Sequence, residues 1–528
     1  MSFCEKRLES TCKHVYNTFM MKLKSYLLGL ILLLAGCSQN QNLTLNVIHT
    51  NDLHSHLLPF NDYANCSIDS EDCLGGFARL VTFLQKEKQN PNTLVLDAGD
   101  RFTGTSFYTL TKSQYLTPLF QMMPYDVITL GNHEFDDNLS QTESFLSDWQ
   151  VPVVVANMNV PLTETLSSLV KPFVILEREQ RKIGVIGLLT PETNVMKPSG
   201  IQITDIHETL TRTIDILKQE NVDIIFVLSH IGLMADKEIA KHFPDIDVIV
   251  GGHSHSLLSN DAQQFNRIDN YPIVCNEGKT VVVSVGKGGQ FVGKLSVEFD
   301  EKGQIVSYQG DSIPMSHEIP NDTEAREQIK QAEKKLHHIL HEEIASIRQD
   351  YSFTPGTNYC SENCLIGEYV ATQLYRAYPT IDGVLLNAGS FRRGLKQGDI
   401  QYQHLIEVYP YDNEAVLITL TGAELQSYLV HGISRYQTES KTNELLQTAG
   451  IRYTFSPVDK VLRRVLIGGK PLDLNRTYTF LTSQFLAEGG DDYPIKSYQK
   501  TGRSIRTILK EQITVMPDVD IQNPVQIE

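Results

Sequence analysis

The sequence predicts an α/β protein built from two domains. Its 528 residues are more than one hydrophobic core usually serves, so two domains are the default expectation. Up to about residue 318, short apolar segments rich in β-branched residues alternate with segments of helical periodicity. Several of the apolar segments stop at Asp, Asn or His, which predicts an α/β domain whose functional site gathers at the strand ends.

The composition and net charge limit the kinds of molecule that the protein is expected to bind. The hydrophobic fraction of 41% is typical of a soluble globular protein. The net charge of −17 argues against a nucleic acid partner, because phosphate backbones are bound by basic surfaces. A small anionic substrate remains compatible with this charge if local cations, from side chains or metals, reverse the field inside one cleft.

The N-terminal residues 1–37 are predicted to be a signal peptide, with the true start at Met20 or Met21. Two lysines precede an apolar stretch that is too short to be a comfortable transmembrane span. The ending Leu-Ala-Gly-Cys resembles a bacterial lipobox, in which Cys37 is acylated; an uncleaved anchor helix is the alternative. We therefore expect an exported, membrane-anchored lipoprotein in the periplasm or on the cell surface.

In an exported protein, closely spaced cysteines are expected to form disulfides. Cys66 and Cys73 form one close pair, and Cys360 and Cys364 form another, so we expect two small-loop disulfides. Metal binding by these thiols is the alternative, and it is disfavoured because no histidine flanks either pair at ligand spacing.

The first domain is expected over residues 43–318. Helical periodicity marks residues 77–88 and 207–220. Five apolar, β-branched segments that end in polar residues are expected to be strands: 43–49, 93–99, 126–132, 222–230 and 247–253.

A connector is expected over residues 319–348. The sequence predicts one helix over 321–348, because Asn321 and Glu324 fit a capping pattern and an apolar face follows. A second α/β domain is expected over 350–528, with polar loops at 387–394, 409–414 and 485–494.

The five strand ends carry carboxylates, imidazoles and one amide, without thiolates. Such ligands suit divalent metals of intermediate hardness, namely Zn²⁺, Mn²⁺ or Fe²⁺. Any one of them alone could be a helix cap or an ordinary polar histidine. Together they predict a metal centre, and the residues concerned are Asp52, His54, Asp100, Asn132, His133, His230, His253 and His255.

These motifs carry a family resemblance. Asp52-x-His54, Gly99-Asp100, Gly131-Asn132-His133-Glu134 and Gly252-His253-x-His255 resemble the pattern of calcineurin-like metallophosphoesterases. The longer segments 96–107 and 131–137 resemble the 5′-nucleotidase branch, which includes ecto-5′-nucleotidases and bacterial periplasmic nucleotidase/UDP-sugar hydrolases. The resemblance runs from about residue 45 to beyond 491 and so covers both domains.

The resemblance implies an N-terminal four-layer α/β/β/α metallophosphatase domain and a C-terminal α/β substrate-binding domain. It also implies two divalent metal ions, zinc, manganese or similar, that activate a hydroxide for attack at phosphorus. His255 departs from the family pattern, in which Asn or Gln often stands. The implied ligands are Asp52, His54, Asp100 and His255 for one metal, and Asp100, Asn132, His230 and His253 for the other, with Asp100 bridging.

The same resemblance assigns His133 and Asp136 as a catalytic dyad that stabilises the transferring phosphoryl group, with Glu134 and Asp137 in supporting or capping roles. In the second domain it implies a substrate site. Asn387 and Arg392 belong to a substrate-binding loop in which Arg392 would bind phosphate, Tyr411 and Phe485 would stack on the base, and Asp491 would accept from the ribose hydroxyls. Without the resemblance, ordinary core packing would be preferred for the two rings.

Two departures bear on the substrate. The familiar proteins carry extra phosphate-binding arginines just before the position of Cys364, whereas residues 352–364 here contain none; Arg393 could compensate. Tyr411 stands where Phe is usual.

We therefore expect a 5′-nucleotidase that hydrolyses nucleoside 5′-monophosphates. The alternative is a UDP-sugar or NAD-type diphosphate hydrolase, or a 2′,3′-cyclic nucleotide phosphodiesterase, on the same scaffold. A non-catalytic surface binding protein is the remaining interpretation, and a homodimer stays open.

Overall fold

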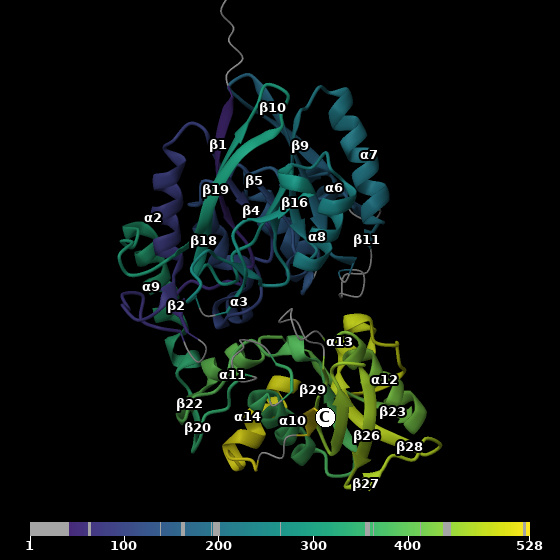
Figure 1. Cartoon of the computed structure of the whole chain (residues 1–528). Helices are drawn as coiled ribbons and strands as arrows, with labels where there is room; N and C mark the ends of the chain where they lie inside the picture. The colour runs from purple at the N-terminus through teal and green to yellow at the C-terminus, as the bar shows by residue number, and fades with distance from the viewer. Residues whose placement is uncertain are drawn as a thin grey trace, which may run out of the picture.

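The chain folds into two α/β bodies placed end to end (Figure 1). The computed structural model describes residues 42–527 except 62–64, 138, 160–163, 192, 194–200, 265, 354–359, 363, 412, 437–444 and 521–523. The predicted leader and Cys37 lie outside the described residues. The first domain runs from β1 to β19, and the second from β20 to β30.

One sheet of the first domain has seven strands in the order β19-β18-β1-β4-β5-β6-β8. Its central strands β1, β4 and β5 are mutually parallel, while β18 runs antiparallel to β1. The strands are β1 (Leu43–Thr50), β4 (Thr93–Asp97), β5 (Val127–Thr129), β6 (Val153–Val154), β8 (Val170–Lys171), β18 (Phe291–Phe299) and β19 (Ile305–Pro314).

A second sheet has six strands in the order β16-β17-β13-β12-β10-β9. Here β10, β12, β13 and β17 are parallel, and the edge strands are antiparallel to them. The strands are β9 (Phe173–Arg178), β10 (Arg181–Leu189), β12 (Ile224–His230), β13 (Val248–Gly251), β16 (Ile273–Cys275) and β17 (Thr280–Val283).

The two sheets pack face to face. One continuous core joins residues of the first sheet, such as Leu45 and Leu96, to residues of the second, such as Val185 and Val227, all completely buried. Helices α2 (Phe77–Lys88) and α9 (Thr323–Leu340) cover the outer face of the first sheet. Helices α7 (Ile206–Gln219) and α8 (Leu233–His242) cover the second. This arrangement confirms the expected α/β/β/α layering.

Shorter elements fill the connections of the first domain. They are β2 (Pro59–Phe60), β3 (Leu74–Gly75), α3 (Ser106–Thr111), α4 (Leu116–Phe120), η2 (Asn132–Phe135), α5 (Leu139–Ser147), β7 (Met158–Asn159), α6 (Glu164–Leu169), β11 (Gln202–Ile203), β14 (Leu257–Leu258) and β15 (Arg267–Asp269).

The connector helix differs from the prediction at both ends. Asp322, not Asn321, caps α9 by accepting the Ala325 N–H, and the helix stops at Leu340 rather than at residue 348. Residues Glu343–Ile347 form the strand β20 instead, paired antiparallel with β22 (Gly398–Gln401). Pairing with a distant strand therefore overrides the local helical pattern.

The second domain is built on a five-stranded sheet, β24-β21-β28-β23-β29, and a four-stranded sheet, β27-β26-β25-β30. The strands are β21 (Gly383–Leu386), β23 (Glu414–Thr421), β24 (Gln447–Ala449), β25 (Ile451–Ser456), β26 (Val461–Ile467), β27 (Lys470–Pro471), β28 (Thr477–Ser483), β29 (Tyr498–Ser504) and β30 (Val525–Ile527). The helices are α10 (Leu365–Ala377), α11 (Tyr402–Val408), α12 (Gly422–Ser434), α13 (Gln484–Ala487) and α14 (Ile505–Val515).

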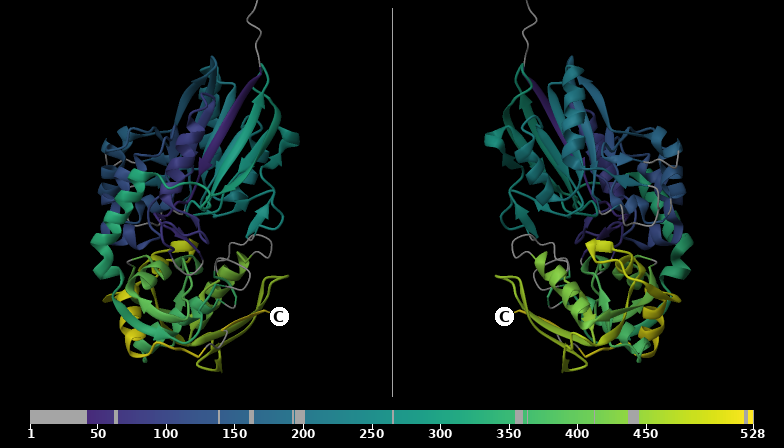
Figure 2. Two further views of the ribbon diagram at one scale, coloured as in Figure 1. Left: turned by 90° about the vertical axis from the view of Figure 1, so that its left-hand side faces the viewer. Right: turned by 90° about the vertical axis from the view of Figure 1, so that its right-hand side faces the viewer.

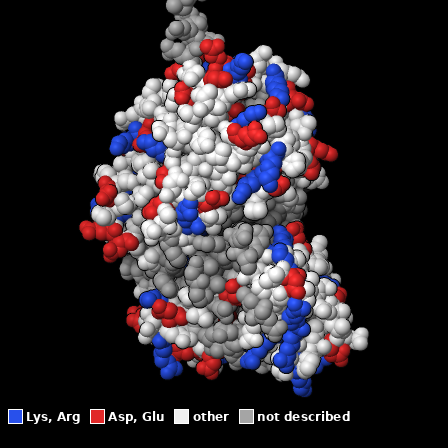
Figure 3. All heavy atoms as spheres, viewed as in Figure 1, with Lys and Arg blue, Asp and Glu red and all other residues white. Residues whose placement is uncertain are grey.

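Strand β1 begins at the end of the first domain remote from the second domain and runs toward it, as the side views of Figure 2 also show. On the face drawn in Figure 3, acidic and basic side chains are intermixed over both domains. Within the part of the chain that the structure describes, none of the helices has the length and apolar character needed to cross a bilayer.

Candidate metal centre

The metal centre forms where the parallel strands of both sheets end. Asp52 follows β1, Asp100 follows β4 and Asn132 follows β5 in the first sheet, whereas His230 ends β12 and His253 follows β13 in the second. Because the sheets are packed face to face with these ends adjacent, the loops converge at the boundary with the second domain. The ligand-type side chains fall into two groups, Asp52 with His54 and His255, and Asp100 with His230 and His253.

In the first group, two imidazoles face each other across a short gap. His54 Nδ1 donates to the Thr103 carbonyl at 2.8 Å, which leaves the lone pair of Nε2 pointing into the site. That Nε2 lies 2.8 Å from His255 Nε2, and His255 Nε2 lies 3.5 Å from Asp52 Oδ1. Burial holds the pKa of both histidines well below the usual value. Neutral imidazoles beside a buried carboxylate fit a divalent cation.

The second group contains a buried imidazole nitrogen that faces a carboxylate. His230 Nδ1 lies 2.6 Å from the Ala98 carbonyl oxygen and donates to it, and the His230 side chain is completely buried. The His230 Nε2 is 3.1 Å from Asp100 Oδ2. Asn132 Oδ1 lies 3.1 Å from His253 Nδ1, so the predicted amide ligand joins the same group. A buried nitrogen facing carboxylate and amide oxygens fits a second cation.

Asp100 stands between the two groups. Its Oδ2 lies 3.1 Å from His230 Nε2 and 3.7 Å from His54 Nε2. Burial alone would lower the pKa of His230, but the attraction of Asp100 outweighs it and raises that pKa to about 10. Asp100 thus lies beside imidazoles of both groups, and its role as a bridging ligand stays a prediction.

The backbone at the ligands is strained. Asp52, His54, Asp100, His253 and His255 all have left-handed φ angles, of 50°, 46°, 58°, 72° and 51°. Non-glycine residues rarely adopt this region, and each such residue costs of order 1 kcal/mol. Five strained residues among the candidate ligands indicate that the orientation of these side chains lowers the stability of the fold.

Glycines allow the strand ends to approach each other. A methyl group on Gly131 would overlap the Asp100 carboxylate, and one on Gly99 would lie 2.6 Å from the Gly131 nitrogen. A methyl group on Gly252 would come within 2.9 Å of His230 Nδ1. These positions need glycine because of the close approach of neighbouring loops.

The two residues predicted as a dyad, His133 and Asp136, are in contact. His133 lies in η2, and its Nδ1 is 2.9 Å from Asp136 Oδ2. Burial would lower the pKa of His133, but Asp136 and Asp100 together raise it. The His133 Nε2 points away from Asp136, toward the second domain, where Arg392 Nη2 lies 2.8 Å away.

Glu134 was expected to have only a supporting role, and the structure defines that role. Its buried carboxylate accepts the backbone N–H groups of Asp100, Arg101 and Gly131 at 3.1, 2.6 and 2.6 Å. It thereby ties the loop after β4 to the loop after β5. The position of Glu134 directly after His133 places it near the site, but the sequence does not show which backbone N–H groups it binds.

The second domain reaches the centre through two loops, which carry Arg392 and Tyr411. Tyr411 Oη accepts hydrogen bonds from Arg392 Nε, at 2.8 Å, and from Arg392 Nη2. The Tyr411 ring centroid lies 5.7 Å from that of His133. Arg392 and Tyr411 are therefore held together beside the dyad.

The remaining predicted substrate residues lie in neighbouring loops. Asn387 Nδ2 donates to Asp491 Oδ2 at 2.9 Å, and Asp491 has a left-handed φ of 53°. Phe485 lies in α13, half-buried against Gly490. The ring contacts among the described residues include none between Tyr411 and Phe485, so the base sandwich stays a prediction.

Both expected disulfides are present, Cys66–Cys73 and Cys360–Cys364. The alternative of metal binding by these thiols is therefore wrong.

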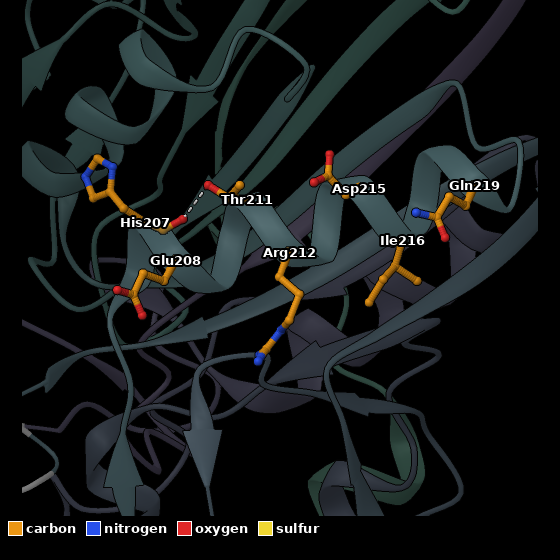
Figure 4. Close-up of a pocket in the computed structure, with 7 residues that line it drawn as sticks. All are labelled: His207, Glu208, Thr211, Arg212, Asp215, Ile216 and Gln219. Atoms are coloured by element: carbon orange, nitrogen blue, oxygen red, sulfur yellow. Dashed lines mark hydrogen bonds between the residues drawn. The ribbon is translucent and has the colours of Figure 1, made fainter.

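A shallow pocket elsewhere on the first domain is lined by residues of α7 (Figure 4). Its side chains, among them His207, Glu208 and Asp215, are spaced along the helix rather than gathered at one point, so they do not resemble a ligand set.

Two family comparisons match the chain. Residues 45–257 match the calcineurin-like phosphoesterase family, and residues 343–498 match the 5′-nucleotidase C-terminal domain.

Whole-chain relatives carry related names. An apyrase of Tabanus yao is 30% identical over 88% of this chain and 90% of its own length. The 5′-nucleotidase of Homo sapiens is 29% identical over 85% of this chain and 84% of its own. The crystal structure of a 5′-nucleotidase precursor from Thermus thermophilus covers 92% of this chain and 99% of its own, with a TM-score of 0.83 and 28% identity.

The close packing of the strand-end loops predicts the effect of Gly131→Ala. The added methyl group displaces the Asp100 carboxylate, so affinity for Mn²⁺ or Zn²⁺ falls by at least about tenfold, the size of effect expected when ligand orientation is lost. Calorimetric titration of metal into metal-free protein measures it. Gly389→Ala is the control, because its methyl group would contact only Asn387 Nδ2 at 3.7 Å. Equal metal affinity in both variants would contradict the assignment.

Proposed function

The chain belongs to the 5′-nucleotidase family, whose first domain is a calcineurin-like phosphoesterase, and from that premise we propose that it hydrolyses nucleoside 5′-monophosphates to nucleoside and phosphate. The proposal rests on the contact between the two domains at the His133–Asp136 pair. Arg392, from the second domain, lies 2.8 Å from His133, from the first, beside two groups of metal ligands. A phosphate ester held there contacts an arginine, an imidazole and both metal positions.

Each side chain has a part in this reaction. Asp52, His54, Asp100 and His255 would hold one divalent ion, and Asp100, Asn132, His230 and His253 the other. When bound, the two ions supply Lewis-acid chemistry and an activated water for attack at phosphorus.

The dyad and Arg392 act on the substrate. Asp136 holds His133 Nδ1–H, so Nε2 faces the cleft and stabilises charge on the phosphoryl group or delivers a proton to the leaving oxygen. Arg392 supplies a planar fork of donors for the phosphate oxygens. Tyr411 fixes that fork by accepting two of its N–H groups.

The second domain is proposed to select the nucleotide. Asn387 and Asp491, which already pair with each other, present an amide and a carboxylate that suit phosphate and ribose hydroxyls. Tyr411 and Phe485 supply aromatic faces for the base, at about 1–3 kcal/mol per stack.

Export and anchoring belong to the same proposal. The leader and the acylated Cys37 fit a protein whose two disulfides need an oxidising compartment. One relative is a snake venom 5′-nucleotidase of Naja atra, 28% identical over 85% of this chain. Dimerisation stays open.

Hydrolysis by the metal-loaded protein, followed by chromatography of the products, tests the substrate, because cleavage of UDP-glucose, NAD or 2′,3′-cyclic AMP does not itself free inorganic phosphate. AMP, ADP, UDP-glucose, NAD and 2′,3′-cyclic AMP are compared at equal concentration with Mn²⁺ or Zn²⁺. We expect the highest kcat/KM for AMP. Preference for a diphosphate or a cyclic nucleotide would assign the same chemistry to the alternative substrate class.

Substitutions at the metal centre distinguish residues that bind metal from residues that act on the substrate. Asp100→Asn removes the bridging carboxylate, so both bound metal and turnover are lost. His133→Ala leaves the ligands in place, so metal content is retained while kcat falls by about 10²–10⁴-fold, the range for general acid–base groups. Phosphate release and elemental analysis of the purified variants measure both quantities. Substantial turnover in either variant would overturn the mechanism.

Arg392→Ala tests the link between the domains. Loss of charge-assisted hydrogen bonds to phosphate raises KM for AMP by about 10–100-fold. Tyr411→Phe is the matched comparison, since it keeps the ring and removes only the hydroxyl that orients Arg392; its KM rises less. Equal KM values for Arg392→Ala and the parent would remove Arg392 from the phosphate site.

A further inference from the structure

A second polar contact joins the domains beside the metal centre, and the reaction above does not use it. Arg393 follows Arg392 in the same loop, but its side chain lies in the domain interface, 3% exposed. Its Nη1 is 3.1 Å from Oε2 of Glu407, which lies on α11 and is 1% exposed. This buried ion pair belongs entirely to the second domain. Its arginine is occupied by a carboxylate, so it is not a substitute for a phosphate-binding arginine.

The first domain meets this pair with the amide of Asn65, and His56 Nδ1 also lies 3.4 Å from Arg393 Nη2. Asn65 Oδ1 accepts from Arg393 Nη2 at 2.9 Å, while Asn65 Nδ2 donates to Glu407 Oε1 at 2.5 Å. An amide is suited to this place because it offers both a donor and an acceptor. The Arg393 guanidinium also lies 4.8 Å from the centroid of the Phe60 ring.

Asn65 is tied to the first domain by a backbone bridge, and a disulfide follows it directly. Asn65 forms a β-bridge with Phe60, whose strand β2 pairs with β3. The Cys66–Cys73 disulfide closes the segment directly after Asn65. The buried Arg79 donates to the Cys73 carbonyl at 2.9 Å. The disulfide, the pairing of β2 with β3 and the Arg79 hydrogen bond therefore hold Asn65 at the surface that faces the second domain.

We propose that Asn65, Arg393 and Glu407 form an interdomain clasp that holds the arrangement in which Arg392 reaches His133. Arg393 and Asn65 are thus positioning residues, acting through the neighbouring Arg392. A buried ion pair is stable only when its remaining donors and acceptors are satisfied. When the domains are in contact, Asn65 satisfies a remaining donor of Arg393 and a remaining acceptor of Glu407. When the domains separate, water takes the place of Asn65. Loss of the clasp is therefore expected to let the domains separate and to take Arg392 away from His133.

The test uses Asn65→Leu in the full-length, metal-loaded protein. The Arg393–Glu407 pair stays within its own domain, so the second domain keeps its fold. Small-angle X-ray scattering without substrate is expected to give a larger radius of gyration than the parent. KM for AMP is expected to rise about 3–10-fold, because a smaller fraction of molecules is in the binding-competent arrangement, while kcat does not fall. Asn65→Ser, a smaller change, gives the same direction.

Glu71→Gln is the matched control, since Glu71 is exposed on the same disulfide loop; it keeps the parent values. A parent-like radius of gyration and KM in Asn65→Leu would overturn the clasp, and so would a fall in kcat at unchanged KM and radius. The kinetic readout rests on the proposed function, whereas scattering does not. Failure of the parent to hydrolyse AMP therefore leaves the clasp decided by scattering alone.

Discussion

The geometry of the metal centre depends on one buried carboxylate, that of Glu134. It accepts four backbone N–H groups from two different strand-end loops and so fixes the distance between Asp100 and Asn132. Such a buried anion is tolerable only because it is fully hydrogen-bonded. Behind it, Arg101 pairs with the buried Asp97, and Asp97 accepts from Thr50 Oγ1 on β1 at 2.5 Å. The ligand set thus rests on a polar network inside the first sheet rather than on the ligands themselves.

Much of the first domain could be predicted from sequence because its strands are apolar, β-branched and abruptly terminated. Strands β1, β4, β5, β12 and β13 lie within the five expected segments to within a few residues. Their ligands could be predicted because each follows a strand directly. The helix over 321–348 was predicted too long, since Ile344 and Ile347 are three residues apart and continue the helical spacing, although both lie in β20. Local pattern cannot reveal that β22, more than fifty residues later, pairs there.

The rest of the site consists of long-range contacts between polar side chains. Arg392 and His133 are 259 positions apart, and Arg393 and Asn65 are 328 apart. Neither pairing leaves a periodic trace in the sequence. Two adjacent arginines illustrate the limit: one faces the dyad and the other faces a buried glutamate, and only the three-dimensional arrangement distinguishes them. Similarly, the resemblance marked Tyr411 as a base-stacking ring, whereas its hydroxyl also anchors Arg392.

The direction of β1 sets how the molecule can be attached to a surface. The strand starts at the far end of the first domain and delivers Asp52 at the domain boundary. Its eight residues, at about 3.3 Å each, separate the incoming chain from the ligands by about 26 Å. A bead or a fusion partner joined ahead of Leu43 therefore attaches at the end of the first domain that is remote from the second domain.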